Sequence, residues 1–207
     1  MKFKRAAVAS FVSASGGVGK TKLSLILAYH LSKNGQRVLF IDLDPTAGAS
    51  LTVLNEDEYD ERVRKRSTLS DALEQYLVQR AIVEPSSVIA AARVGDAFVD
   101  FVVPGERLIR VVDELWKSSS AGLRFKRALE SFIPFEKYDY IFVDNAPFFD
   151  PRYTALSLHI SDCLFIPLRP SLIDLKRTSR MVFWLDEEVA TTEGGERLRE
   201  NIYAVFN

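Results

Sequence analysis

Residues 6–21 read AAVASFVSASGGVGKT, and this stretch decides the fold. Its first half, residues 6–13, is an apolar run typical of a buried strand, and residues 21–34 carry apolar side chains at helical spacing. Gly35 then stands where a helix-ending glycine is expected. The glycines between the strand and the helix let the backbone curl so that several N–H groups point inward. The stretch therefore predicts a phosphate-binding loop.

The residues of this loop have separate expected contacts. The Lys20 side chain would reach the β- and γ-phosphates, and the Thr21 hydroxyl would bind Mg²⁺. The usual pattern GxxxxGK[ST] is not fully met, because Ala14 stands at its first glycine, whereas GGxGKT is met. The positive end of the helix dipole adds to the attraction for phosphate. The expected nucleotide-binding residues are Gly16, Gly17, Val18, Gly19, Lys20, Thr21 and Lys22.

Outside the loop, short apolar runs alternate with amphipathic segments. Residues 56–66 carry nine charges in eleven positions, which is typical of a solvated loop or an exposed helix. Alternating strands and helices predict an α/β fold with a mostly parallel, twisted sheet and helices on both faces. We expect further strands at 37–42, 98–103, 138–144, 162–168 and 201–206, and helices at 69–79, 88–92, 108–117, 122–132, 153–159 and 171–189.

The composition sets limits on the class of protein. The 207 residues suit a single domain, 1–207, and 47% hydrophobic residues argue against disorder. No apolar run approaches the roughly 20 residues that span a bilayer. The single cysteine, Cys163, excludes an intrachain disulfide and favours a cytoplasmic location. The net charge of −1 gives no global attraction for nucleic acid. A final strand with nothing to cover it suggests natural residues beyond Asn207.

Three carboxylates follow predicted strands, where ligands of such sheets bind. Asp42 and Asp44 are two residues apart after the second strand, so both side chains would leave on the same side. Asp144 ends the strand at 138–144 and is the better candidate for the water shell of Mg²⁺. Mg²⁺ keeps several waters and takes only one or two carboxylates, which suits this small set. The alternative for each aspartate is a helix cap or a turn residue.

Several motifs in the right order resemble the ParA/MinD group of P-loop ATPases, whose loop reads xKGGxGK[ST]. Residues 37–50 (RVLFIDLDPTAGAS) look like the second motif of that family, Asp-x-Asp-Pro. Residues 138–147 (YDYIFVDNAP) look like its strand-plus-Asp motif, and residues 101–115 resemble its strand, proline and following helix. The resemblance covers residues 6–168 and is closer to ParA than to MinD. It implies the P-loop NTPase fold.

The resemblance also implies a function. Members of this family use ATP, ADP and Mg²⁺, and the ATP-bound homodimer holds nucleotide at its interface. ParA-type dimers bind DNA non-specifically, and a ParB-like centromere-binding partner stimulates hydrolysis, so the expected place is the nucleoid. The resemblance assigns the attacking water to Asp44 and the second shell of Mg²⁺ to Asp42.

Ser15 departs from the family pattern. The family has a signature lysine just before the two glycines, and that lysine reaches the nucleotide of the partner subunit. A serine carries no charge, and comparable trans-acting cations contribute about 10³–10⁵ in rate. Ser15 therefore predicts impaired hydrolysis, either as an engineered trap or as a natural degenerate subunit.

Four basic residues are candidates for DNA contact. Lys176, Arg177 and Arg180 share one edge of the predicted helix at 171–189, and Arg169 precedes it. A two-fold dimer would double this stripe of cations and neutralise DNA phosphates without reading sequence. The alternative is an ordinary exposed helix face.

Three other functions stay open. A MinD-like membrane switch needs a C-terminal amphipathic helix, which residues 1–207 do not contain. An ATP-binding scaffold that does not hydrolyse ATP would agree with Ser15. A small-molecule ligase of the same superfamily, similar to dethiobiotin synthetase, would need a substrate site that the sequence does not indicate.

Overall fold

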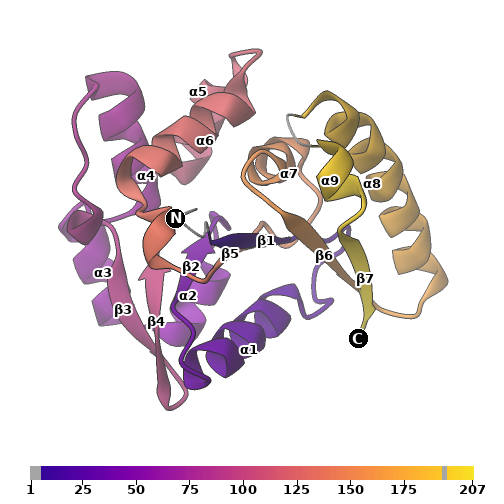
Figure 1. Ribbon diagram of the computed structural model, residues 1–207, viewed down its shortest axis with the longest axis horizontal. Coiled ribbons are helices and arrows are strands. Elements are labelled where there is room, and N and C mark those ends of the chain that lie inside the picture. The colour runs from indigo at the N-terminus through magenta and orange to yellow at the C-terminus, as the bar shows by residue number, and fades with distance from the viewer. Residues whose placement is uncertain (1–5, 193–194) are drawn as a thin grey trace, which may run out of the picture.

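The computed structural model describes residues 6–192 and 195–207. Its centre is a seven-stranded sheet in the order β3-β4-β2-β5-β1-β6-β7 (Figure 1). Neighbouring strands pair in parallel, except that β3 runs antiparallel to β4. The strands are β1 Ala7–Phe11, β2 Val38–Asp42, β3 Ala90–Val94, β4 Ala97–Val102, β5 Tyr140–Asp144, β6 Cys163–Leu168 and β7 Ile202–Phe206.

Helices cover both faces of the sheet. One face carries α1 Lys20–Lys33, α2 Gly48–Val53 and α3 Glu56–Arg64. The other carries α4 Leu69–Glu74, α5 Leu108–Trp116, α6 Ala121–Phe132, α7 Pro151–Leu158, α8 Leu172–Thr191 and α9 Gly195–Arg199. Three short helical segments complete the described chain: η1 Gln75–Gln79, η2 Pro85–Ser87 and η3 Phe135–Lys137. The expected fold class is confirmed.

Alternating residues of the central strands build the two cores. In β2, Leu39 and Ile41 pack among the helices α4–α7, whereas Phe40 faces α1 and α2. The Phe40 ring stacks on Phe101 of β4 with 4.9 Å between ring centroids. All five residues of β2 are buried, as a central parallel strand covered on both faces requires.

One predicted helix is wrong. Residues 88–92 were expected to be helical, but Ala90–Val94 is the edge strand β3, which pairs with β4. A two-residue turn, Gly95 and Asp96, joins the two strands, and Gly95 has φ 65°. This hairpin adds the seventh strand, which the sequence analysis did not predict.

Two other expectations gain detail. The segment 56–66 forms the exposed helix α3, and its start is fixed by a capping box between Asn55 and Glu58. The predicted helix at 69–79 is α-helical only to Glu74 and continues as a π-helix, η1, over Gln75–Gln79. The remaining predicted strands and helices are confirmed with small shifts at their ends.

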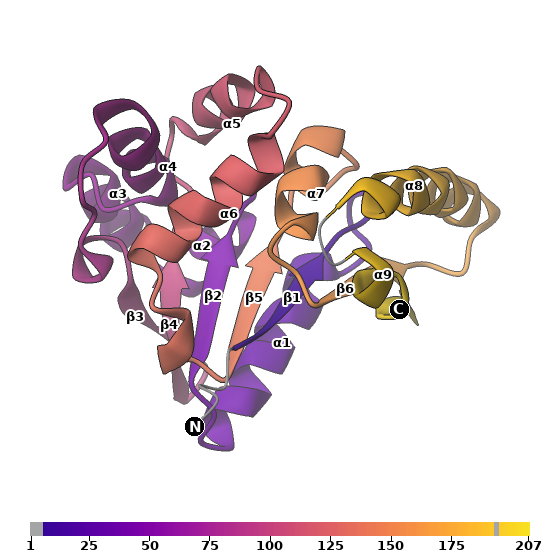
Figure 2. The same ribbon diagram turned by 45° about the horizontal axis from the view of Figure 1, so that its top comes forward.

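The strand order brings the candidate site together. Strand β5 lies between β1 and β2, and Asp144 is in register with both Phe11 and Asp42. Figure 2 shows β2, β5 and β1 side by side, with α1 packed beneath them. The loop after β1 therefore lies next to the ends of β2 and β5.

Candidate functional site

The loop between β1 and α1 has a backbone that presents its N–H groups. Gly17 and Gly19 have φ values of 71° and 82°, a region that favours glycine. From Ser13 to Lys22, no backbone N–H donates a hydrogen bond to another residue that the structure describes. Gly16 and Gly17 are exposed, and the first N–H groups of α1 have no partner within the helix, so these donors are open to a ligand. This run of unpaired donors therefore forms a cradle for an anion.

Lys20 and Thr21 point from the start of α1 toward the end of β5. The Lys20 side chain is buried, and its Nζ lies 2.7 Å from Asp144 Oδ1. Nζ also donates to the backbone oxygen of Asn145. The Thr21 hydroxyl donates to Asp144 Oδ2 over 2.7 Å. Burial raises the pKa of Asp144, and the Lys20 ammonium opposes that rise. The structure thus brings together the three residues expected to bind phosphate and Mg²⁺.

Asp42 is fully buried and joins the end of β2 to α2. Its Oδ2 accepts hydrogen bonds from the Ser50 backbone N–H and hydroxyl, at 2.8 and 2.7 Å. Its Oδ1 accepts from the Asp44 N–H at 3.0 Å. Burial, together with the charge of Asp144, raises the pKa of Asp42 to about 7. Asp42 holds the backbone of Asp44 and Ser50 in place, and both of its carboxylate oxygens already accept hydrogen bonds.

Asp44 lies in a tight turn between β2 and α2. Its Oδ1 accepts from the backbone N–H and the hydroxyl of Thr46, both at 2.8 Å. Ala47, in the same turn, has φ 56°, which costs a non-glycine residue about 1–2 kcal/mol. Strained backbone of this kind tends to occur at functional sites.

Ser15 is buried and contacts the start of α8. Arg177 Nη1 donates to Ser15 Oγ over 3.5 Å, a long hydrogen bond. Asp174 lies beside this contact, and hydrogen bonds from Arg169, Ser15 and Ser171 lower the pKa of its carboxyl to about 2. A guanidinium therefore lies next to the position where the family has its signature lysine.

The four basic residues predicted to contact DNA differ in their surroundings. Arg169 is ion-paired with Asp174, with 2.7 Å between Nε and Oδ2, so much of its charge is neutralised. Arg177 lies at the phosphate-binding loop, where it contacts Ser15. Lys176 and Arg180 are exposed, and neither makes an ion pair within the described ranges 6–192 and 195–207. Their role in DNA binding stays a prediction.

Three polar residues at the site were missed by the sequence analysis. Ser13 Oγ and Asn145 Oδ1 are buried and have no hydrogen-bond partner in the described part of the chain. Asn207 follows β7, and its Nδ2 donates to the Val18 carbonyl over 3.1 Å. The place of Asn145, directly after Asp144, could have indicated its role, whereas nothing in the sequence pattern links Asn207 to the loop.

The site suits a nucleotide phosphate and Mg²⁺. Unpaired N–H groups and the Lys20 ammonium provide the positive side, and the Thr21 hydroxyl and Asp144 carboxylate provide hard oxygen ligands. The unpartnered Ser13 and Asn145 oxygens are further acceptors at the same edge. The residues present therefore fit both groups.

Comparison with known proteins agrees with the fold and the family that the sequence predicts. A family model described as "AAA domain" matches residues 6–191. The chromosome partitioning protein ParA of Caulobacter vibrioides is 28% identical over 84% of this chain, which spans 60% of that protein's length.

Two solved structures share the fold. A putative plasmid partition protein from Borrelia burgdorferi, bound to AMPPNP, has a TM-score of 0.73 and 22% identity over 98% of this chain and 76% of its own. Cobyrinic acid a,c-diamide synthase from Mycobacterium smegmatis, with a bound ATP analogue and magnesium, has a TM-score of 0.78 and 18% identity over 97% of this chain and 74% of its own. The chain belongs to the AAA-domain family and is a P-loop ATPase domain of the ParA/MinD type.

Proposed function

We propose that this domain is a Mg²⁺-ATP-dependent switch of the partition type. The observation that carries the proposal is the run of unpaired N–H groups from Ser13 to Lys22, with the buried Lys20 beside it. The nucleotides and magnesium in the two structural relatives support ATP and Mg²⁺ as its ligands.

Each residue of the site has a role in this proposal. Lys20, which now pairs with Asp144, would bind the β- and γ-phosphates, and the loop N–H groups would hold the remaining phosphate oxygens. Thr21 and Asp144 would hold Mg²⁺, which would neutralise charge on the phosphates. Asp44 orients the attacking water, and Asp42 fixes Asp44 through the Asp44 N–H. Catalysis is then positioning and charge stabilisation.

The wider function follows the relatives. We infer that ATP drives a homodimer with nucleotide at its interface, that the dimer binds DNA non-specifically through Lys176 and Arg180, and that a ParB-like partner stimulates hydrolysis. The partitioning protein from Caulobacter supports this assignment by name. A cytoplasmic, nucleoid-associated location belongs to the same proposal.

A second candidate function is an ATP-binding scaffold that hydrolyses ATP very slowly. Ser15 favours it, because the position of the signature lysine carries no charge. Arg177 is the residue that brings positive charge closest to this position along α8. No helix in the described part of the chain is long and apolar enough to cross a bilayer.

The test is ATP binding by Lys20→Ala, measured by calorimetry with Mg²⁺. We expect affinity to fall by roughly tenfold to a hundredfold, because a charged hydrogen bond to phosphate contributes about 1.5–3 kcal/mol and the cradle loses its buried ammonium. Lys117→Ala is the matched control, since Lys117 is exposed and pairs only with Glu114. Unchanged affinity in a folded Lys20→Ala variant would mean that the site is placed wrongly.

A further inference from the structure

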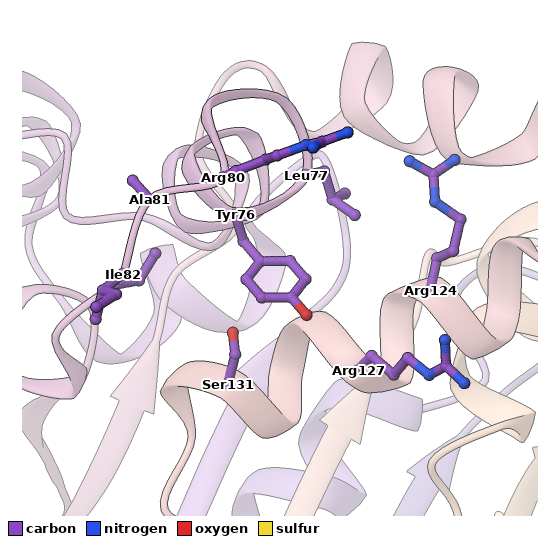
Figure 3. A pocket seen from close by; sticks show the side chains of 9 residues that line it. Tyr76, Leu77, Arg80, Ala81, Ile82, Arg124, Arg127 and Ser131 are labelled. Atoms are coloured by element: carbon purple, nitrogen blue, oxygen red, sulfur yellow. The ribbon is translucent and has the colours of Figure 1, made fainter.

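A hollow separate from the nucleotide site lies between η1, the segment after it and α6 (Figure 3). Its volume is about 480 Å³, within the range of about 300–1,000 Å³ usual for small-molecule sites. None of the residues that line it belongs to the nucleotide site. The lining includes Tyr76, Leu77, Arg80, Val83, Arg124 and Arg127.

Three arginines in this hollow lack counterions. The guanidinium groups of Arg80 and Arg124 point toward one another, and Arg127 follows Arg124 by three residues on α6 (Figure 3). In the residues that the structure describes, none of the three has an ion pair or a side-chain hydrogen bond. Arg80 and Arg127 are exposed and Arg124 is half-buried, so these guanidinium groups are open to an anion from solvent.

The neighbouring acidic side chains are already paired. Glu74 and Glu114 line an adjoining hollow together with Arg124. Glu74 pairs with Arg107 at 3.0 Å, and Glu114 pairs with Lys117 at 2.6 Å. The positive charge of the hollow is thus left for a ligand.

The backbone beside the hollow is unusual in two ways. Gln75–Gln79 is a π-helix, a form that occurs frequently at functional sites. Arg80 ends it with φ 52°, at a position where glycine is the usual residue. A left-handed backbone at a non-glycine residue costs about 1–2 kcal/mol, so the backbone is strained at Arg80, whose side chain lines the hollow.

The other wall of the hollow is apolar with one free hydroxyl. The Tyr76 ring and Leu77 pack against the core beneath η1. The Tyr76 hydroxyl points toward α6 and has no hydrogen-bond partner in the described ranges (Figure 3). A flat ring beside two arginine forks suits a ligand with a planar or apolar body and an acidic group.

We propose that this hollow binds a small organic anion, a phosphate ester or a dicarboxylate. Its acidic group lies between Arg80 and Arg124, which bind such groups in bidentate fashion, and its body lies against Tyr76 and Leu77. The proposal does not rest on the nucleotide site or on hydrolysis.

Calorimetry with three probes tests this site on the full chain. Phenyl phosphate represents the phosphate source, phthalate the carboxylate source, and benzyl alcohol is the neutral control. We expect at least one anion to bind with a Kd of about 1 mM or tighter, both with and without saturating Mg²⁺-ADP, and benzyl alcohol to bind more weakly. Binding of neither anion, or binding that Mg²⁺-ADP abolishes, would overturn the proposal.

Variants then locate the binding. Arg80→Gly keeps the left-handed backbone and removes the side chain, and Arg124→Ala removes its neighbour. Combined, they should weaken anion binding by about tenfold or more, the size of one lost charged hydrogen bond. Arg64→Ala combined with Arg199→Ala removes the same charge elsewhere on the surface and should leave binding unchanged. Equal losses in the two double variants would contradict the assignment.

Discussion

Asp42 is buried as deeply as Asp144 but has no cation of its own. Its acceptors are occupied by Ser50 and by the Asp44 N–H, and the only buried ammonium at the site pairs with Asp144. Burying a carboxylate without a cation favours its neutral form. The pKa of Asp42, raised to about 7, follows from this arrangement.

This pKa predicts how stability depends on pH in the nucleotide-free protein. Because the pKa of Asp42 is higher in the folded than in the unfolded state, its contribution to stability is fully present below about pH 4 and is lost as pH rises through about 7. Relative to Asp42→Asn, the free energy of unfolding of the natural chain should fall over this range by up to about 1.4 kcal/mol per pH unit. Urea unfolding at several pH values measures it. Asp57→Asn, in the exposed helix α3, should keep the natural slope, and a slope shared by all three chains would contradict the prediction.

Arg177 and Arg180 should separate nucleotide binding from DNA binding. Arg177 contacts Ser15 of the phosphate loop, whereas Arg180 is exposed one turn further along α8. We expect Arg177→Ala to weaken ATP binding by about tenfold, as for a lost charged contact. Arg180→Ala should leave ATP binding unchanged and lower the salt slope of DNA binding by about 1. Calorimetry and a DNA titration at several salt concentrations distinguish them, and identical profiles would show that Arg177 is simply another surface cation.

At the level of elements, the hairpin β3–β4 depends on its turn. Gly95 has φ 65°, and a Cβ on it would lie 2.9 Å from Tyr29 Cε2 of α1. Gly35, after α1, has φ 79° with nothing within 4 Å of the added Cβ. Gly35→Ala should therefore lower the free energy of unfolding only by the cost of a left-handed alanine, about 1 kcal/mol. Gly95→Ala should lower it by more, because the added Cβ also meets Tyr29. Thermal or urea unfolding gives the difference, and a smaller loss for Gly95→Ala would show that Tyr29 moves aside freely.

The same hairpin shows where sequence patterns reach their limit. Residues 88–92 include three consecutive alanines, which favour helix, and this local preference led to the wrong prediction. The two-residue Gly95–Asp96 turn, followed by the β-favouring run at 97–102, was the signal that could have corrected it. The π-helical turn at Gln75–Gln79 had no such signal, because α- and π-helices share nearly the same sequence pattern.

The candidate site likewise has one part that the sequence could predict and another that it could not. Lys20, Thr21 and Asp144 could be predicted to meet, because a loop motif and strand ends in a parallel sheet share one edge. The contacts of Ser15 with Arg177 and of Asn207 with Val18 join residues 162 and 189 positions apart. Such contacts follow from the order of strands and the angle of α8, neither of which a pattern of local residues defines.

On the scale of the whole molecule, the nucleotide edge continues onto the start of α8. Leu172 and Ile173 are 77% and 65% exposed there, close to the Ser15–Arg177 contact. Exposed apolar side chains beside a polar site are typical of interaction surfaces. This surface supports the proposed dimer, in which a second copy would cover the start of α8 at Leu172 and Ile173 and face the phosphate loop.

Ser15→Lys tests whether this dimer works by the mechanism of the family. If the missing charge limits hydrolysis, the natural chain should bind Mg²⁺-ATP and double its mass in light scattering but turn over slowly. The lysine variant should then hydrolyse ATP faster by as much as about 10³–10⁵, the contribution of comparable cations. Ser15→Ala is the control for the loss of the hydroxyl, and it should stay as slow as the natural chain. If the natural chain and Ser15→Lys turn over alike, a cation elsewhere already stabilises the transition state, and Arg177 is the first residue to substitute in both backgrounds.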